Sequence, residues 1–169
     1  MARLSIPAVP AGRLIVPVDR RPATGIVHLG LGNFHRAHLA VYTAQAVRET
    51  GGDWGIFAYS SYDSAPAQGM REQDLLYSVV ELSPTGSAAY VPGIHTGAVG
   101  SDGDVNLVLD EIAKAGTKIV SLTVTEAGYD VDPTTRQLNL TLPKVSADPA
   151  GGPPRSHHGA ELRQHVRER

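Results

Sequence analysis

The chain has 169 residues, enough for one domain of ordinary size with a substantial hydrophobic core. Hydrophobic residues make up 41% and charged residues 19%, which is the composition of a globular protein rather than a disordered or fibrous one. The net charge of -2, with no basic block in the body of the chain, argues against nucleic acid as a partner, and the lack of cysteine excludes disulfides and thiolate chemistry.

Residues 1–24 are rich in proline and are expected to form an irregular arm on the domain surface. They hold no long apolar core, so they do not look like a signal peptide. No apolar run in the chain approaches the ~20 residues that a membrane-spanning helix needs. We therefore expect a cytoplasmic protein with no membrane partner.

The arm is followed by the pattern of a strand, a glycine turn and a helix. Ile26–Leu29 is a short apolar run typical of a buried strand, Gly30 and Gly32 are spaced Gly-x-Gly, and a helix is expected from Phe34 to Glu49. A dinucleotide-binding loop requires this context, because the first glycine permits the tight turn and the second lets the backbone approach a pyrophosphate. His35 replaces the third glycine of the usual fingerprint, so an ordinary strand-to-helix turn stays an alternative.

Further strands and one more helix are expected along the chain. The expected strands are Trp54–Tyr59, Leu75–Leu82, Ala88–Val91, Ile94–Val99 and Ile119–Thr125. We expect the third and fourth of these to form a hairpin against the main sheet, and the last, rich in β-branched residues, to be buried. Residues 60–69 are expected to be an irregular loop, whereas apolar residues at helical spacing predict a helix between the capping residues 101–104 and Gly116.

This alternation of strands and helices predicts an α/β fold. The expected architecture is Rossmann-like, a mostly parallel twisted sheet with helices on both faces, of which the chain holds an incomplete part. The expected domain organisation is the arm in 1–24, a dinucleotide-binding domain in 25–147, and a poorly packed tail rich in Arg, His and Pro in 148–169.

Two segments resemble a known family. Residues 30–38, Gly-Leu-Gly-Asn-Phe-His-Arg-Ala-His, followed by Tyr42, resemble the opening of the mannitol dehydrogenase family of long-chain polyol dehydrogenases and fructuronate (hexuronate) reductases. Residues 119–129 resemble the family's strand that ends in Thr-Glu-x-Gly-Tyr. Residues 53–56 and 73–77 lie between them in the family's order, so the resemblance covers roughly residues 12–145.

The resemblance implies an oxidoreductase that uses NAD(H) or NADP(H), usually without metal, on a polyol or keto-sugar substrate. The family's catalytic motif, Lys-x4-Asn-x2-His, belongs to a second domain, and none of Lys114, Lys118 and Lys144 begins it. We therefore expect a cofactor-binding portion with no catalytic residue of its own, whose uncovered surfaces favour self-association. The alternatives are a non-catalytic nucleotide-binding or interaction module and, less favoured, a metal-dependent hydrolase.

The cofactor is expected at the glycine turn, with the backbone amides from Asn33 to His35 facing its phosphates. The expected loop residues are Gly30, Gly32, Asn33, Phe34, His35 and Arg36. Phe34 and Arg36 are placed there by the resemblance. A solvated Arg36, or one that pairs with a following domain, is the alternative.

Asp63 is the residue that we expect to bind the adenosine ribose. Asp53 stands at the usual interval from the glycines, but it precedes a strand, and ligands bind at the carboxyl ends of parallel strands. Asp63 follows that strand, with Ser60 and Ser61 as further ribose contacts and no adjacent arginine for a 2′-phosphate. This favours NAD and leaves NADP open, and an ordinary surface aspartate is the alternative for Asp63.

Thr125 and Glu126 end the last predicted strand, so they too are expected at the cofactor crevice. Glu126 is a candidate for proton movement near the nicotinamide, and the alternative is a carboxylate that caps a helix or forms an ion pair.

Three histidines suggest a metal site as an alternative interpretation of this segment: His28, His35 and His38. His35 and His38 are three apart on the expected helix, which can place both on one face. We expect no metal, because the family resemblance already accounts for these positions.

Overall fold

The computed structural model describes residues 4–6, 9–10 and 12–123. Thr125, Glu126 and the predicted tail lie outside the described residues.

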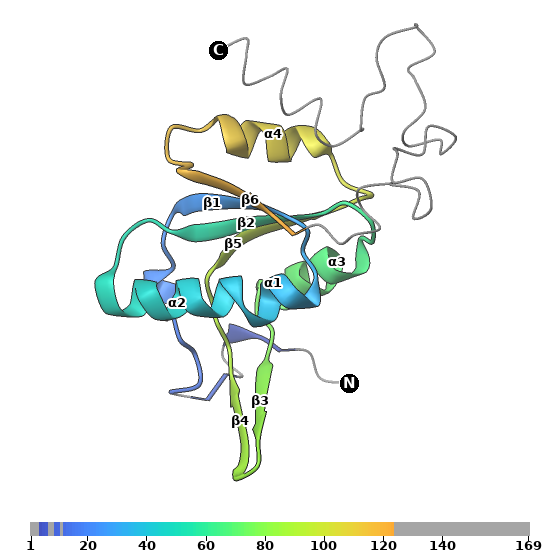
Figure 1. Ribbon diagram of the computed structural model, residues 1–169. Coiled ribbons are helices and arrows are strands. Elements are labelled where there is room, and N and C mark those ends of the chain that lie inside the picture. The colour runs from blue at the N-terminus through green and yellow to red at the C-terminus, as the bar shows by residue number, and fades with distance from the viewer. Residues whose placement is uncertain (1–3, 7–8, 11, 124–169) are drawn as a thin grey trace, which may run out of the picture. The chain divides into compact units, whose positions relative to one another are not determined.

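Four parallel strands form the central sheet of the described part. They are β1 (Thr24–Leu29), β2 (Gly55–Ser60), β5 (His95–Gly100) and β6 (Ile119–Leu122). Their spatial order is β5-β2-β1-β6, so the chain builds outward from β1 through β2 to β5 and then returns to the other side of β1 (Figure 1). This is the order of a doubly wound nucleotide-binding fold, which confirms the Rossmann-like prediction.

Helices cover both faces of this sheet, as predicted. Figure 1 shows α1 (Asn33–Ala37), α2 (Leu39–Thr50) and α3 (Ala65–Arg71) on one side and α4 (Val105–Ala113) on the other. Alternate strand residues supply the two cores, with Ile26 and Ile56 facing α2, and Val27 and Tyr59 facing Val108 of α4. No helix within the described ranges has the length and apolar character needed to cross a membrane.

Two segments differ from the predicted helix boundaries, and each difference has a local cause. The expected helix Phe34–Glu49 is two helices, because His38 leaves helical geometry with φ -121° and ψ -78°. The expected loop 60–69 contains the start of α3, whose first turn holds Pro66. Proline is tolerated in a first turn because the helix needs no amide donor there.

The hairpin forms from different strands than we predicted. β3 (Val79–Ser83) pairs antiparallel with β4 (Gly86–Tyr90), and the predicted fourth strand is β5, which joins the parallel sheet instead. Gly93, with φ +67°, lies between β4 and β5, where an added Cβ would stand 2.6 Å from the Val16 carbonyl oxygen. A residue with a side chain would therefore clash with the arm at this point, between the hairpin and the parallel sheet.

Both ends of the described region also depart from expectation. Among its described residues, the predicted arm has little regular structure beyond the 3-10 turn η2 (Val18–Arg20), yet Ile15 and Val16 are buried in the core. The predicted buried strand, β6, leaves Val120 46% and Leu122 60% exposed. Within the described residues β6 is an edge strand whose partner is β1.

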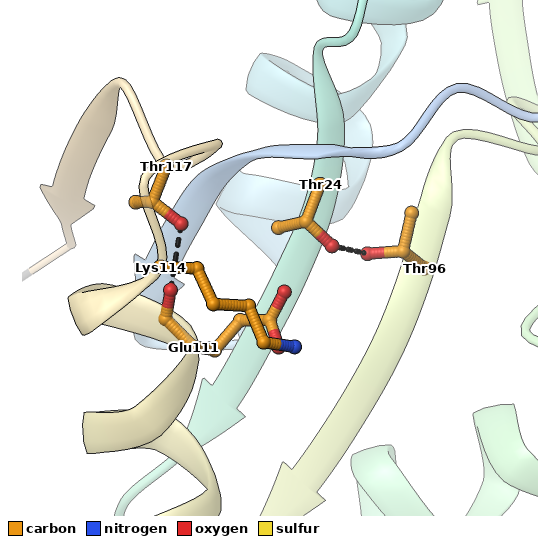
Figure 2. A network of polar contacts seen from close by, with 5 residues as sticks. All are labelled: Thr24, Thr96, Glu111, Lys114 and Thr117. Atoms are coloured by element: carbon orange, nitrogen blue, oxygen red, sulfur yellow. Dashed lines mark hydrogen bonds and ion pairs between the residues drawn. The ribbon is translucent and has the colours of Figure 1, made fainter.

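At the amino end of the sheet, two threonines join strands that are not neighbours. Thr24 of β1 and Thr96 of β5 point toward each other and share a hydrogen bond of 2.8 Å between their hydroxyls (Figure 2). They flank the start of β2 at Gly55, where an added Cβ would lie 2.5 Å from Thr96 Cγ2. Beyond α4, the Thr117 hydroxyl donates to the backbone carbonyl of Glu111 (2.7 Å) and closes the helix end (Figure 2).

Candidate functional site

The candidate site lies where the carboxyl ends of β1 and β6 meet. Thr123, directly after β6, donates its amide to the Leu29 carbonyl (2.9 Å), and the amides of Gly30 and Leu31 both donate to the Tyr59 carbonyl at the end of β2. The turn after β1 is thus held by backbone hydrogen bonds on both sides. Ligands of open α/β sheets bind at this point, where the direction of winding reverses.

Gly30 has to be glycine for two independent reasons. Its φ of +113° is a conformation that residues with a side chain rarely adopt, and an added Cβ would lie 2.7 Å from the Thr123 carbonyl oxygen. The first glycine of the pattern therefore allows the turn to pass the end of β6.

Gly32 is less crowded. It is the N-cap of α1 with φ -98° and makes no side-chain cap, and among the described residues an added Cβ would meet only the Gly30 carbonyl oxygen, at 3.9 Å. The first helical hydrogen bond runs from the Arg36 amide to the Gly32 carbonyl (3.1 Å), so the amides of Asn33 to His35 start the helix without intrahelical acceptors. An N-cap without a side-chain cap, beside amides that have no intrahelical acceptor, fits an anionic group such as a pyrophosphate.

The side chains of the loop fold back onto it. Arg36 donates from Nε to the Gly32 carbonyl (3.4 Å) and from Nη2 to Asn33 Oδ1. Phe34 is 64% exposed and stacks on His38, with ring centroids 4.6 Å apart. The Arg36 guanidinium is therefore part of the loop, next to the open N-cap.

Asp63 and Asp53 lie at opposite ends of the sheet, as their positions around β2 require. Asp53 accepts the Ala23 amide (3.2 Å) before β2 begins. Asp63 comes after β2 and accepts the Ala65 amide (2.9 Å), so it forms the turn that starts α3. Ser60, the last residue of β2, is 7% exposed.

Beneath the glycine turn lies a row of buried histidines, which we call the histidine stack: His28 of β1, His35 of α1 and His95 of β5. The His28 and His35 rings are parallel at 3.8 Å, and His35 Nε2 lies 3.0 Å from His95 Nε2. Burial, together with the nearby charges, lowers the pKa of His35 to about 2 and that of His95 to about 3, so both rings are neutral at pH 7.

Sequence reasoning found only part of this stack. His35 and His38 do not share a face, because His35 is fully buried and His38 is exposed. His95 was not singled out, since its contact with His35 joins residues 60 positions apart. Across the described residues, no group of three or more His, Cys, Asp or Glu side chains is placed to hold a metal ion.

The sheet order, the glycine turn at the reversal of winding and the open N-cap together define a Rossmann-type nucleotide-binding domain. The chain belongs to the family of the mannitol dehydrogenase Rossmann domain, whose family model matches residues 24–151.

Relatives and solved structures agree with this assignment. The mannitol 2-dehydrogenase of Aspergillus niger is 42% identical over 149 residues, which cover 85% of this chain and 30% of that protein. That of Aspergillus terreus is 38% identical over 142 residues, covering 80% and 28%. The chain thus spans about a third or less of the length of these relatives.

Two solved structures share the fold. A substrate-free D-sorbitol dehydrogenase has a TM-score of 0.79 and 31% identity, with 100% of this chain and 36% of that one covered. The mannitol 2-dehydrogenase of Pseudomonas fluorescens, a ternary complex with NAD and D-mannitol, has a TM-score of 0.71 and 29% identity, with 85% and 31% covered.

Replacement of Gly30 by alanine is expected to destabilise the fold by about 2–4 kcal/mol, because it combines left-handed strain with a clash against Thr123. Gly51→Ala is the matched control, since Gly51 has φ +70° and ψ -158° but no described atom within 4 Å of an added Cβ, so it should incur only the backbone strain of about 1–3 kcal/mol without a clash. Urea unfolding of both variants measures the difference. Equal losses would mean that Thr123 yields to the side chain.

Acid is expected to destabilise the protein through the histidine stack. The folded-state pKa values of His35 and His95 lie below the value of about 6.5 in an unfolded chain, so unfolding takes up protons below that pH. The stabilising contribution is complete above about pH 6.5 and falls by about 1.4 kcal/mol per pH unit for each histidine as the pH drops toward 3. Urea unfolding between pH 7 and 4.5, compared with His95→Gln, tests this, and an unchanged slope in the variant would contradict it.

Proposed function

We propose that this chain is the NAD-binding part of an oxidoreductase that interconverts a secondary alcohol of a polyol or hexonate with its ketone. The observation that carries the proposal is the N-cap at Gly32, which has no side-chain cap among the described residues and adjoins the amides at the start of α1 that have no intrahelical acceptor. The family assignment supports it, as does the similar Pseudomonas fluorescens enzyme, which is a complex with NAD and D-mannitol.

The chain's own residues would bind and orient the dinucleotide. The Gly32 position admits the pyrophosphate, the amides from Asn33 to His35 donate to it, and Arg36 supplies positive charge beside it. Thr125 and Glu126 remain proposed contacts on the nicotinamide side. When bound, NAD supplies the hydride acceptor for the alcohol.

Proton transfer is proposed to depend on residues outside this sequence. The Lys-x4-Asn-x2-His pattern of the family begins at none of the lysines Lys114, Lys118 and Lys144. The same observation favours a second candidate, a nucleotide-binding module without catalysis. Neither candidate predicts turnover by this chain alone, because the general base that the first requires lies outside it. Turnover assays with mannitol, fructose and fructuronate therefore separate the two only when the chain is joined to the remaining portion of a related mannitol 2-dehydrogenase, where the first predicts turnover and the second predicts none.

Gly32→Ser is expected to weaken NADH binding about tenfold or more while stability stays the same or rises. Serine is a good N-cap, so its hydroxyl stabilises α1 by accepting an amide hydrogen bond that the pyrophosphate would otherwise receive. NADH fluorescence titration and thermal unfolding give the two readouts. Gly69→Ser is the control, because Gly69 lies in α3 and no atom of the described residues lies within 4 Å of an added Cβ. Unchanged NADH affinity in Gly32→Ser would assign the turn a structural role only.

Asp63→Asn is expected to reduce NAD affinity about tenfold and to leave NADP affinity unchanged or improved. The amide oxygen of asparagine can still accept the Ala65 amide, so the turn survives while the charge is lost. A carboxylate accepts hydrogen bonds from the ribose hydroxyls and repels a 2′-phosphate, which gives the difference between the cofactors. Titrations with both cofactors measure it, and an unaltered NAD to NADP ratio would make Asp63 an ordinary turn residue.

A further inference from the structure

His28 occupies a core position where its neighbours along β1 are apolar. It is 2% exposed, and each of its ring nitrogens has a polar partner: Nδ1 lies 2.9 Å from Ser121 Oγ, and Nε2 lies 3.2 Å from the Gly30 carbonyl oxygen and 3.1 Å from Thr123 Oγ1. These partners belong to β6, to its carboxyl end and to the glycine turn. One side chain therefore links the two segments that border the candidate site.

The partners determine which nitrogen carries the proton. A carbonyl oxygen only accepts, so His28 Nε2 must donate to Gly30, and Thr123 Oγ1 takes a second share of the same N–H. Burial lowers the pKa of His28, so the ring is neutral at pH 7 and Nδ1 has a free lone pair. Ser121 then donates its hydroxyl proton to Nδ1. All three contacts are compatible with this single tautomer.

His28 also supports the helix that follows the turn. Its ring lies parallel to that of His35, at 3.8 Å, and His35 Nε2 in turn lies 3.0 Å from His95 Nε2. Tyr77, whose ring contacts His95 edge-on, donates its hydroxyl to the Arg36 carbonyl (2.8 Å). Contacts from the core thus hold the short helix α1 at two successive residues, His35 and Arg36.

We propose that His28 is a positioning residue for the dinucleotide: its Nε2–H holds the Gly30 carbonyl, and its ring seats His35, so that the amides of α1 face the pyrophosphate. This inference rests on the proposed function for the ligand itself. The inference adds His28, a residue of β1 outside the glycine pattern, to the residues that determine the affinity of the loop for the dinucleotide.

Two substitutions separate the Nε2 donor from the bulk of the ring. Glutamine has an amide nitrogen at the ε position, so His28→Gln keeps a donor toward Gly30. Asparagine has its amide group at the δ position, so His28→Asn loses that donor and keeps only an oxygen that can accept from Ser121. Both lose the stacked ring. We expect His28→Asn to raise the Kd for NADH about tenfold and His28→Gln to raise it no more than about threefold, at a temperature where both are folded.

Thermal unfolding of the same samples shows whether affinity merely follows stability. Affinities that follow the melting temperatures, or equal affinities of the two variants, would overturn the positioning role. If the unsubstituted chain does not bind NADH, the proposed function is contradicted rather than the role of His28. Whether His28 anchors the glycine turn is then tested by two measurements made without cofactor.

These readouts are the nitrogen chemical shifts of the His28 ring and hydrogen exchange of the Leu31 amide, which donates to Tyr59 within the turn. We expect the Nε2–H tautomer, and exchange at Leu31 that is about tenfold faster in His28→Asn than in His28→Gln. An Nδ1–H ring, or equal exchange in both variants, would show that His28 does not hold the turn.

Discussion

The contact between Gly30 and the backbone of Thr123 is the constraint on which the site depends. Because β6 returns to lie beside β1, the turn that leaves β1 must pass the end of β6 at a distance that admits no side chain. The turn therefore rises from the sheet and begins α1 with a bare N-cap at Gly32. The two glycines have different tasks, since the first makes room for protein and the second leaves room for a ligand.

The histidine stack is a costly way to fill the space below this turn. His35 Nδ1 and His95 Nδ1 are both buried and lack hydrogen-bond partners among the described residues, and such groups typically cost about 1–3 kcal/mol each. Apolar side chains would avoid this penalty and the loss of stability in acid. What they could not provide is the directed N–H of His28 toward Gly30. The stack is thus better explained by the geometry of the turn than by the stability of the core.

The local sequence pattern was enough to predict the parallel sheet, the turn at Gly30 and Gly32, and the placement of Asp53 and Asp63 at opposite ends of β2. Strand periodicity and turn residues act over a few positions, so they can be recognised locally. The local pattern could not show the helix break at His38, since the apolar spacing continues through it. It also missed His95, whose role arises only when β5 is brought below α1. Contacts between residues that are far apart in the sequence cannot be predicted from the local pattern around either residue.

The loop is held by hydrogen bonds within the protein, and this bears on how it would bind a ligand. Gly30 and Leu31 are hydrogen-bonded to β2, and Arg36 is bonded to the Gly32 carbonyl and to Asn33, so few groups are left to order on binding. Fixing them during folding lowers the entropy lost on association, which is the usual benefit of preorganisation. The same rigidity makes affinity sensitive to displacements smaller than a bond length, because hydrogen bonds weaken steeply with distance and angle. A buried side chain that supports the turn can therefore change the affinity for a ligand that it does not contact.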